Sequence, residues 1–158
     1  MKTAGIALLF GLCTLLGARL AARKSKRLTA VRALKHGLGR FSERIAQGET
    51  LKHLASEDGL FFSLLHAYLS ALERGQPEAE AAETACAALG GYLTERDAMR
   101  AFLDALSNAS HTDLLRRIEA LRSVLDRAET EAGTEAKQAR VIRVSGVLVG
   151  AGLAIVLL

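Results

Sequence analysis

The sequence predicts an all-α protein, a compact bundle of about six helices whose N- and C-terminal helices extend into a membrane. Three observations support this prediction. The strong helix formers Ala, Leu, Arg and Glu dominate the 158 residues, and there is a single Pro. Apolar residues recur every three or four positions, and strand-like alternation is missing. An apolar run without charge lies near each end of the chain, at residues 3–18 and 144–158.

Charge is distributed unevenly along the chain. All 17 acids lie between residues 36 and 136, where only ten Lys and Arg accompany them, so this stretch has a net charge of −7. Cations concentrate on either side of it, next to the apolar ends. Only 4% of the residues are aromatic, which disfavours nucleic-acid binding. We expect the cations to contact anionic lipid headgroups. These two basic collars are Arg19, Arg23, Lys24, Lys26 and Arg27, and Lys137, Arg140 and Arg143.

The first apolar segment, residues 3–18, carries no charge. With the residues up to Ala22 it provides roughly 20 positions, enough for a helix to cross about 30 Å of hydrocarbon. We therefore predict an N-terminal transmembrane helix over residues 1–22. A cleaved signal peptide is the alternative, but it would carry its charge before the apolar run and a small-residue cleavage site after it.

The last segment, residues 144–158, is apolar and spans about 22 Å as a helix, which is short for a crossing. A thin or tilted span is predicted if Arg143 snorkels outward; a re-entrant or interfacial tail is the alternative. Gly146 and Gly150 have the spacing that permits close helix packing in a membrane. Because both collars lie inside the apolar ends, the positive-inside rule places residues 23–143 in the cytoplasm, on the cell membrane.

The first half of this middle domain has clear helix boundaries. A helical period over residues 28–45 ends at Gly48, with Gly37 and Gly39 as predicted kinks. Thr50 is a predicted N-cap for a short helix. The most apolar helix ends at Gly75. Its predicted core positions are Phe61, Leu64, Leu65, Tyr68, Leu69 and Leu72.

Three further helices are predicted in the second half. The first starts with Pro77 and ends at Gly90–Gly91. Residues 94–97 resemble a capping box for the next, which Ser107 and Asn108 end. A long last helix runs from Thr112 towards the membrane. Predicted core positions are Met99, Phe102, Leu103 and Leu106, then Leu114, Leu115, Ile118, Leu121, Val124, Leu125 and Ala128.

The chain offers no pattern typical of catalysis. The four His residues have no i,i+4 pair, no glycine-rich phosphate loop is present, and Cys13 and Cys86 form no metal-ligand spacing. We predict buried cysteines, no enzyme activity, no cofactor, no metal and no small-molecule substrate; a membrane-tethered enzyme would need a convergent polar pocket. The candidate docking residues are Glu73, Glu78, Glu80 and Glu83 on one face and Arg116 and Arg117 on another, with solvated helix faces as the alternative.

Several segments carry a family resemblance. They are RIAQGET (residues 44–50), the Phe61–Phe62 helix, ERDAMRAFLDAL (residues 95–106) and the closing SGVLVGAGLAIVLL. Together they resemble the stage III sporulation protein AB family over nearly the whole chain. Gln47 and Leu51 replace the Tyr and Pro usual there, and Ser107–Ser110 replaces a Gly-x-x-Asp.

This resemblance implies a membrane component of a channel-like complex between mother cell and forespore, in the mother-cell membrane around the forespore. It also implies a soluble domain similar to the cytoplasmic domain of type II secretion F-type platform proteins, which would dock a secretion-type ATPase; a homo-oligomer is left open. A general secretion or pilus-type platform outside sporulation is the alternative. Such a protein would carry a duplicated helical domain, whereas this chain has one copy.

Overall fold

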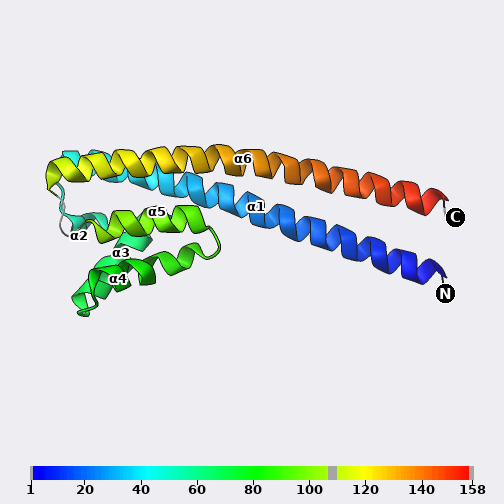
Figure 1. The fold of residues 1–158 in the computed structure, drawn as a ribbon, viewed down its shortest axis with the longest axis horizontal. Helices are drawn as coiled ribbons and strands as arrows, with labels where there is room; N and C mark the ends of the chain where they lie inside the picture. The colour runs from blue at the N-terminus through cyan, green and yellow to red at the C-terminus, as the bar shows by residue number, and fades with distance from the viewer. Residues whose placement is uncertain (1, 107–109, 157–158) are drawn as a thin grey trace. The chain divides into compact units, whose positions relative to one another are not determined.

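The computed structural model describes residues 2–106 and 110–156; for most of residues 2–22 and 140–156 it describes the backbone only. Within these ranges all regular structure is helical, which confirms the predicted all-α class (Figure 1). The elements are α1 (Lys2–Ala46), α2 (Leu51–Leu54), α3 (Leu60–Glu73), α4 (Glu78–Cys86), the 3₁₀ turn η1 (Ala87–Leu89), α5 (Leu93–Asp104) and α6 (His111–Val156).

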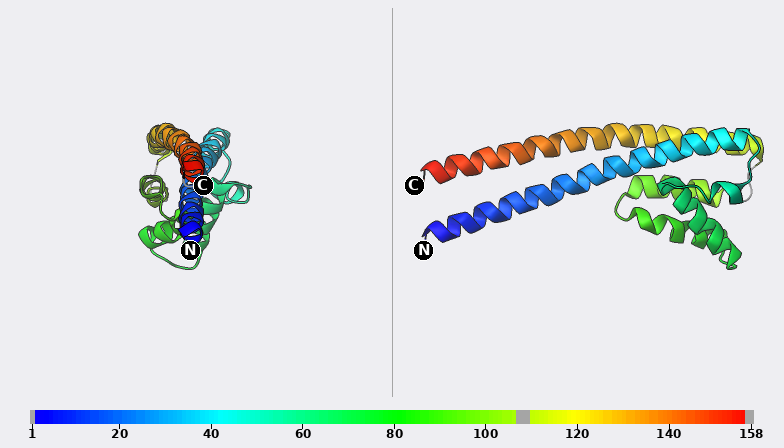
Figure 2. Two further views of the ribbon diagram at one scale, coloured as in Figure 1. Left: turned by 90° about the vertical axis from the view of Figure 1, so that its right-hand side faces the viewer. Right: turned by 180° about the vertical axis from the view of Figure 1, so that it is seen from behind.

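The chain divides into two compact units. The paired-helix unit comprises residues 1–29 and 130–158, and the core unit comprises residues 30–129. In the paired-helix unit the start of α1 and the end of α6 lie side by side and antiparallel, with both termini at the same end (Figures 1 and 2). Ala132 and Ala139 are buried there, where small methyl side chains allow helices to approach closely.

No helix combines, over the residues that the structure describes, the length and apolar character needed to cross a membrane. The predicted spans at residues 1–22 and 144–158 consist mainly of positions whose side chains lie outside the described part. The membrane assignment therefore stays a prediction.

The core unit is built around α3, which contributes six buried side chains. Phe61 contacts Phe41 of α1 and Phe102 of α5, with ring centroids 5.3 Å and 6.1 Å apart, and Phe62 at 5.5 Å. Leu69 and Leu72 are half-buried at the edge of the core, since they lie on the flank of the apolar face. The other predicted core positions of α3 are buried, as predicted, and so are Met99, Phe102 and Leu103 of α5 and Leu106 directly after it.

We expected a kink at Gly37, but α1 continues through this residue without a break, from Lys2 to Ala46. Gly37 instead allows close approach to α3: a Cβ atom at this position would lie 2.4 Å from the Cβ of Phe61. Gly39 has open space around the corresponding position. The chain leaves α1 at Gly48, whose φ of +83° favours glycine, and Gly75 repeats this geometry after α3.

The predicted helix starts need three corrections. Thr50 is the N-cap of α2, but its side chain makes no capping hydrogen bond. Pro77 precedes α4 as its N-cap instead of opening the helix. The capping box at residues 94–97 is wrong, because α5 already begins at Leu93 and Glu95 is buried. The helix therefore starts earlier than the pattern indicates, and a residue that a capping box would leave near the surface is buried.

The residues predicted to end α5, Ser107 and Asn108, lie outside the described part of the structure, and the start predicted for α6 differs from the structure by one residue. The long helix begins at His111, one residue before Thr112, and Leu115 is exposed although its spacing suggested the core. Leu115 lies at the border of the apolar stripe, where a sequence period alone does not separate core from surface.

Candidate functional site

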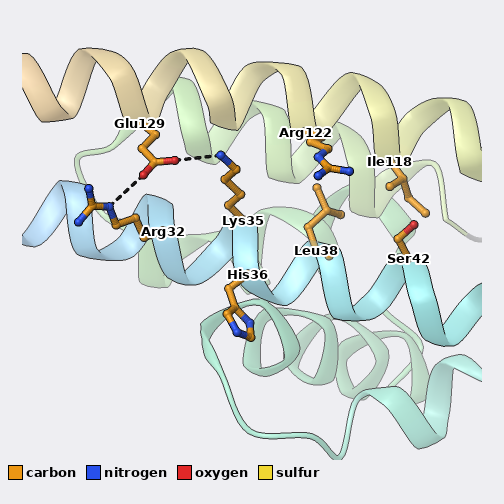
Figure 3. A pocket seen from close by; sticks show the side chains of 9 residues that line it. Arg32, Lys35, His36, Leu38, Ser42, Ile118, Arg122 and Glu129 are labelled. Atoms are coloured by element: carbon orange, nitrogen blue, oxygen red, sulfur yellow. Dashed lines mark hydrogen bonds and ion pairs between the residues drawn. The ribbon is translucent and has the colours of Figure 1, made fainter.

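A cluster of ion pairs connects α1 with α6 inside the core unit. Glu129 accepts hydrogen bonds from the Nε of Arg32 at 2.9 Å and the Nζ of Lys35 at 3.0 Å (Figure 3). Lys35 also pairs with Asp126 at 2.7 Å. The cluster borders a cleft of about 370 Å³ whose apolar lining includes Leu38 and Ile118. Two of the cations lining the cleft are thus already neutralised by acids of α6, which favours a structural role.

These ion pairs predict a pH dependence. The hydrogen bonds that Lys35 donates to Asp126 and Glu129 raise the pKa of Lys35 above 10.5, and those that Glu129 accepts from Lys35 and Arg32 lower the pKa of Glu129 below 4.5. The ionised forms of Glu129 and Lys35 therefore both stabilise the fold fully at pH values between 4.5 and 10.5. The Glu129 contribution is lost as the pH falls through its lowered pKa, and the Lys35 contribution as the pH rises through its raised pKa.

We expect denaturant titrations of the full chain to show stability falling on both sides of this window. Glu129→Gln should flatten the acid limb, since the titrating carboxylate is gone. Glu119→Gln is the matched control, because Glu119 is exposed on the same helix and makes no ion pair in the described part of the chain. Equal effects of the two variants would contradict the assignment.

The predicted acidic docking face does not form one free surface. Glu83 of α4 pairs with Arg96 and, at 2.8 Å, with Arg100, both from α5. Glu73 pairs with Lys52 at 2.8 Å, and this contact lowers the pKa of Glu73. Glu83 therefore joins two helices, which sequence spacing could not reveal.

The other two acids of this face lie in the first turn of α4. Glu80 is exposed, and Glu78 is half-buried. Acids in this position stabilise the positive end of the helix dipole. Of the four predicted acids, Glu80 is the most available to a partner.

Arg116 and Arg117 are exposed on α6 and make no ion pair with the described residues. Arg117 lies at the edge of a groove of about 200 Å³ between α5 and α6. Small and apolar side chains make up the rest of this groove. They are Ala98, Ala101 and Phe102 of α5 and Ala120, Leu121 and Val124 of α6. An apolar groove bordered by an unneutralised cation suits an amphipathic, acidic segment.

The comparisons with known proteins decide the family. A profile described as stage III sporulation protein AB matches residues 2–158. The chain belongs to the stage III sporulation protein AB family. Neither the curated proteins nor the solved structures contain a match. The resemblance drawn from the sequence segments is thereby confirmed, and this family member is a sporulation-related protein. Similarity to the F-type platform domain stays a prediction.

The collars of this stage III sporulation protein AB family member are not uniform. Arg27 is half-buried, and its Nη1 donates to Glu135 at 3.1 Å across the paired helices. Lys24 is half-buried too. The remaining described collar cations, Arg19, Arg23, Lys26 and Lys137, are exposed. The side chains of Arg140 and Arg143 and the surroundings of Gly146 and Gly150 lie outside the described part of the structure.

Sequence reasoning missed a second set of ion pairs, at the end of α1. Arg44 pairs with Glu49 at 2.5 Å and with Glu57 at 3.2 Å, and Arg40 also reaches Glu57, at 3.1 Å. The Arg40 guanidinium lies over the ring of Phe62. These contacts attach the end of α1 to the loop before α3. The sequence shows Arg and Glu residues close together in this region. Such charges are common on helix surfaces, so their spacing alone does not reveal which of them pair.

Cys86 is a buried and weakly reactive thiol. Burial raises the pKa of the Cys86 thiol to about 11, so little reactive thiolate is present at neutral pH. The predicted burial is confirmed for Cys86, whereas the Cys13 side chain lies outside the description. No three His, Cys, Asp or Glu side chains of the described residues are grouped so that they could hold a metal ion.

Proposed function

We propose that this chain is a non-enzymatic membrane component of a sporulation channel, a secretion-like complex between mother cell and forespore. In this role it acts as a platform for partner proteins. Membership of the stage III sporulation protein AB family supports the sporulation part. The membrane and platform parts rest on the paired-helix unit and on the groove between α5 and α6.

The paired-helix unit carries the membrane proposal. Residues 3–18 and 144–158 contain no charged side chain, and residues 3–18 and 144–156 lie at the terminal end of the antiparallel pair (Figure 2). Leu15, Val141 and Val144 are 63%, 64% and 56% exposed. Water disfavours apolar side chains displayed in this way, whereas lipid accepts them. Two helices that become free of charge at the same end of one pair are what a membrane anchor needs.

This placement is testable by fractionation and thiol labelling. In a Cys13→Ala chain the thiol of Cys86 is buried, so the substitution Ser25→Cys supplies the accessible thiol. We expect the chain to stay with carbonate-washed membranes, and the introduced thiol to react with an impermeant maleimide only after the cells are permeabilised. Release by carbonate, or labelling in intact cells, would contradict the membrane placement. Thr84→Cys, at an exposed position of α4, provides a second accessible thiol for the same labelling test.

The α5–α6 groove carries the platform proposal. The Arg117 side chain has no neutralising acid among the described residues, unlike Lys35 and Arg32 at the larger cleft. The small side chains of Ala98 and Ala101 line the groove and leave room for another helix to approach closely. We propose that an acidic, amphipathic helix of a protein of the sporulation complex docks there, a secretion-type ATPase being the partner that the family resemblance suggests.

Photocrosslinking in sporulating cells tests this docking. A photoreactive residue at Ala120, inside the groove, should form adducts with proteins of the sporulation complex, and Arg117→Glu should reduce the yield about tenfold, because it replaces attraction by repulsion. The same residue at Ala79, exposed on α4, is the control position. Adducts that form equally at both positions, or that ignore Arg117→Glu, would remove the groove from consideration.

A further inference from the structure

The first basic collar of α1 contains both exposed and half-buried cations. Arg19, Arg23 and Lys26 are exposed and follow one another at intervals of four and three residues. Residues at this spacing lie on one face of a helix. These three residues form the cationic stripe, which extends about 10 Å along the helix axis.

Arg27, at the end of the collar, contacts α6. Arg27 lies eight positions after Arg19, about 80° around the helix, and its side chain is only 18% exposed. It pairs with Glu135 at 3.1 Å and approaches Glu131 at 3.9 Å. Its charge therefore serves the pairing of α1 with α6. Arg27 is not available for an external anion in the way that the stripe is.

The stripe has no acid to neutralise it within the paired-helix unit. No acid precedes Glu43 in the chain, and none follows Glu135. Both acids of this unit, Glu131 and Glu135, already contact Arg27. None of the three stripe residues has an ion pair in the described part of the structure.

We propose that the cationic stripe binds the phosphate groups of anionic lipids, while Arg27 is reserved for helix pairing. This inference rests on the proposed membrane placement. The stripe begins directly after the charge-free residues 3–18, where a helix leaves the hydrocarbon and meets the headgroups. Long Lys and Arg side chains extend along the helix to reach this layer. Each cation there contributes about a fivefold preference for an anionic surface.

Spin-labelled lipids measure this preference directly. The full chain is reconstituted in phosphatidylcholine vesicles, and the motionally restricted fraction is compared for labelled phosphatidylglycerol and labelled phosphatidylcholine. We expect a severalfold preference for phosphatidylglycerol that declines as salt is raised. In Arg19→Gln/Arg23→Gln/Lys26→Gln most of this preference should be lost, and the remainder comes from the second basic collar, Lys137, Arg140 and Arg143.

The matched control removes three cations elsewhere. Arg116→Gln/Arg117→Gln/Arg122→Gln causes the same change in net charge on exposed positions of α6, and it should keep the preference. An equal loss of the phosphatidylglycerol preference in both triple variants, or no preference in the unaltered chain, would overturn the proposal that the stripe binds anionic lipids. Stronger competition by inorganic phosphate than by chloride at equal ionic strength would point to a free-anion site and also overturn it. Failure to enter vesicles would instead overturn the membrane placement itself.

Discussion

Gly37→Ala should lower the free energy of unfolding of the core unit by about 2 kcal/mol. The new Cβ would lie 2.4 Å from the Cβ and 3.1 Å from the Cγ of Phe61, so α1 and α3 would have to separate. Such overpacking costs about 3 kcal/mol, and the better helix propensity of alanine offsets about 1 kcal/mol. Truncating Phe61 does not relieve the clash, because alanine there would keep the Cβ atom that is approached most closely.

The thiol of Cys86 provides the measurement. It is fully buried in the core, so a thiol reagent reaches it only when the core unit opens. In a Cys13→Ala chain kept in detergent, Gly37→Ala should raise the labelling rate about 30-fold. Gly39→Ala, two residues further on, meets open space and should slow labelling a few-fold through the propensity gain alone. Effects of the same sign at both positions would contradict the close packing of α1 on α3.

Phe61→Ala should destabilise the core unit by about 4 kcal/mol. Its ring is fully buried and contacts the rings of Phe41, Phe62 and Phe102, so truncation leaves a cavity between three helices. The same thiol assay should show an increase of nearly a thousandfold in labelling. In Phe61→Leu most of the volume remains, and the loss should be about 1.5 kcal/mol.

Leu93→Ala is the surface control for this prediction. Leu93 is 65% exposed at the start of α5, so its truncation should change stability by about 0.5 kcal/mol or less. If Phe61→Ala does not accumulate, Phe61→Leu still tests whether Phe61 lies in the core. A residue outside the core would tolerate the change to Leu without loss of stability. A labelling rate for Phe61→Leu equal to that of the unaltered chain would refute the central position of Phe61.

Much of the helical architecture was predictable because local signals suffice for it. Apolar spacing predicted α3 and α5 and most of their buried side chains, and Gly48 and Gly75 marked two helix ends. Helix starts were less predictable. The capping-box pattern at residues 94–97 was misleading, because α5 begins at Leu93 and Glu95 is buried.

The candidate surfaces were predictable as residue types but not as arrangements. The sequence predicted Glu83 as part of an acidic docking face, whereas in the structure it joins α4 to α5 through Arg96 and Arg100. Arg117 was expected on a docking surface, but only the approach of α5 and α6 forms the groove beside it. Ion pairs join residues far apart in the chain, and spacing within one helix cannot show them.

The sequence by itself determined the all-α class, the charge-free ends, the basic collars and the family, because each of these depends on composition and on order along the chain. Only the tertiary structure decided which collar cations face outward and which one, Arg27, pairs the two long helices. It also decided that Gly37 serves close packing and not a kink. The physical reason is that charge neutralisation and steric contact depend on what lies opposite a side chain, and for these residues the opposite group belongs to another helix.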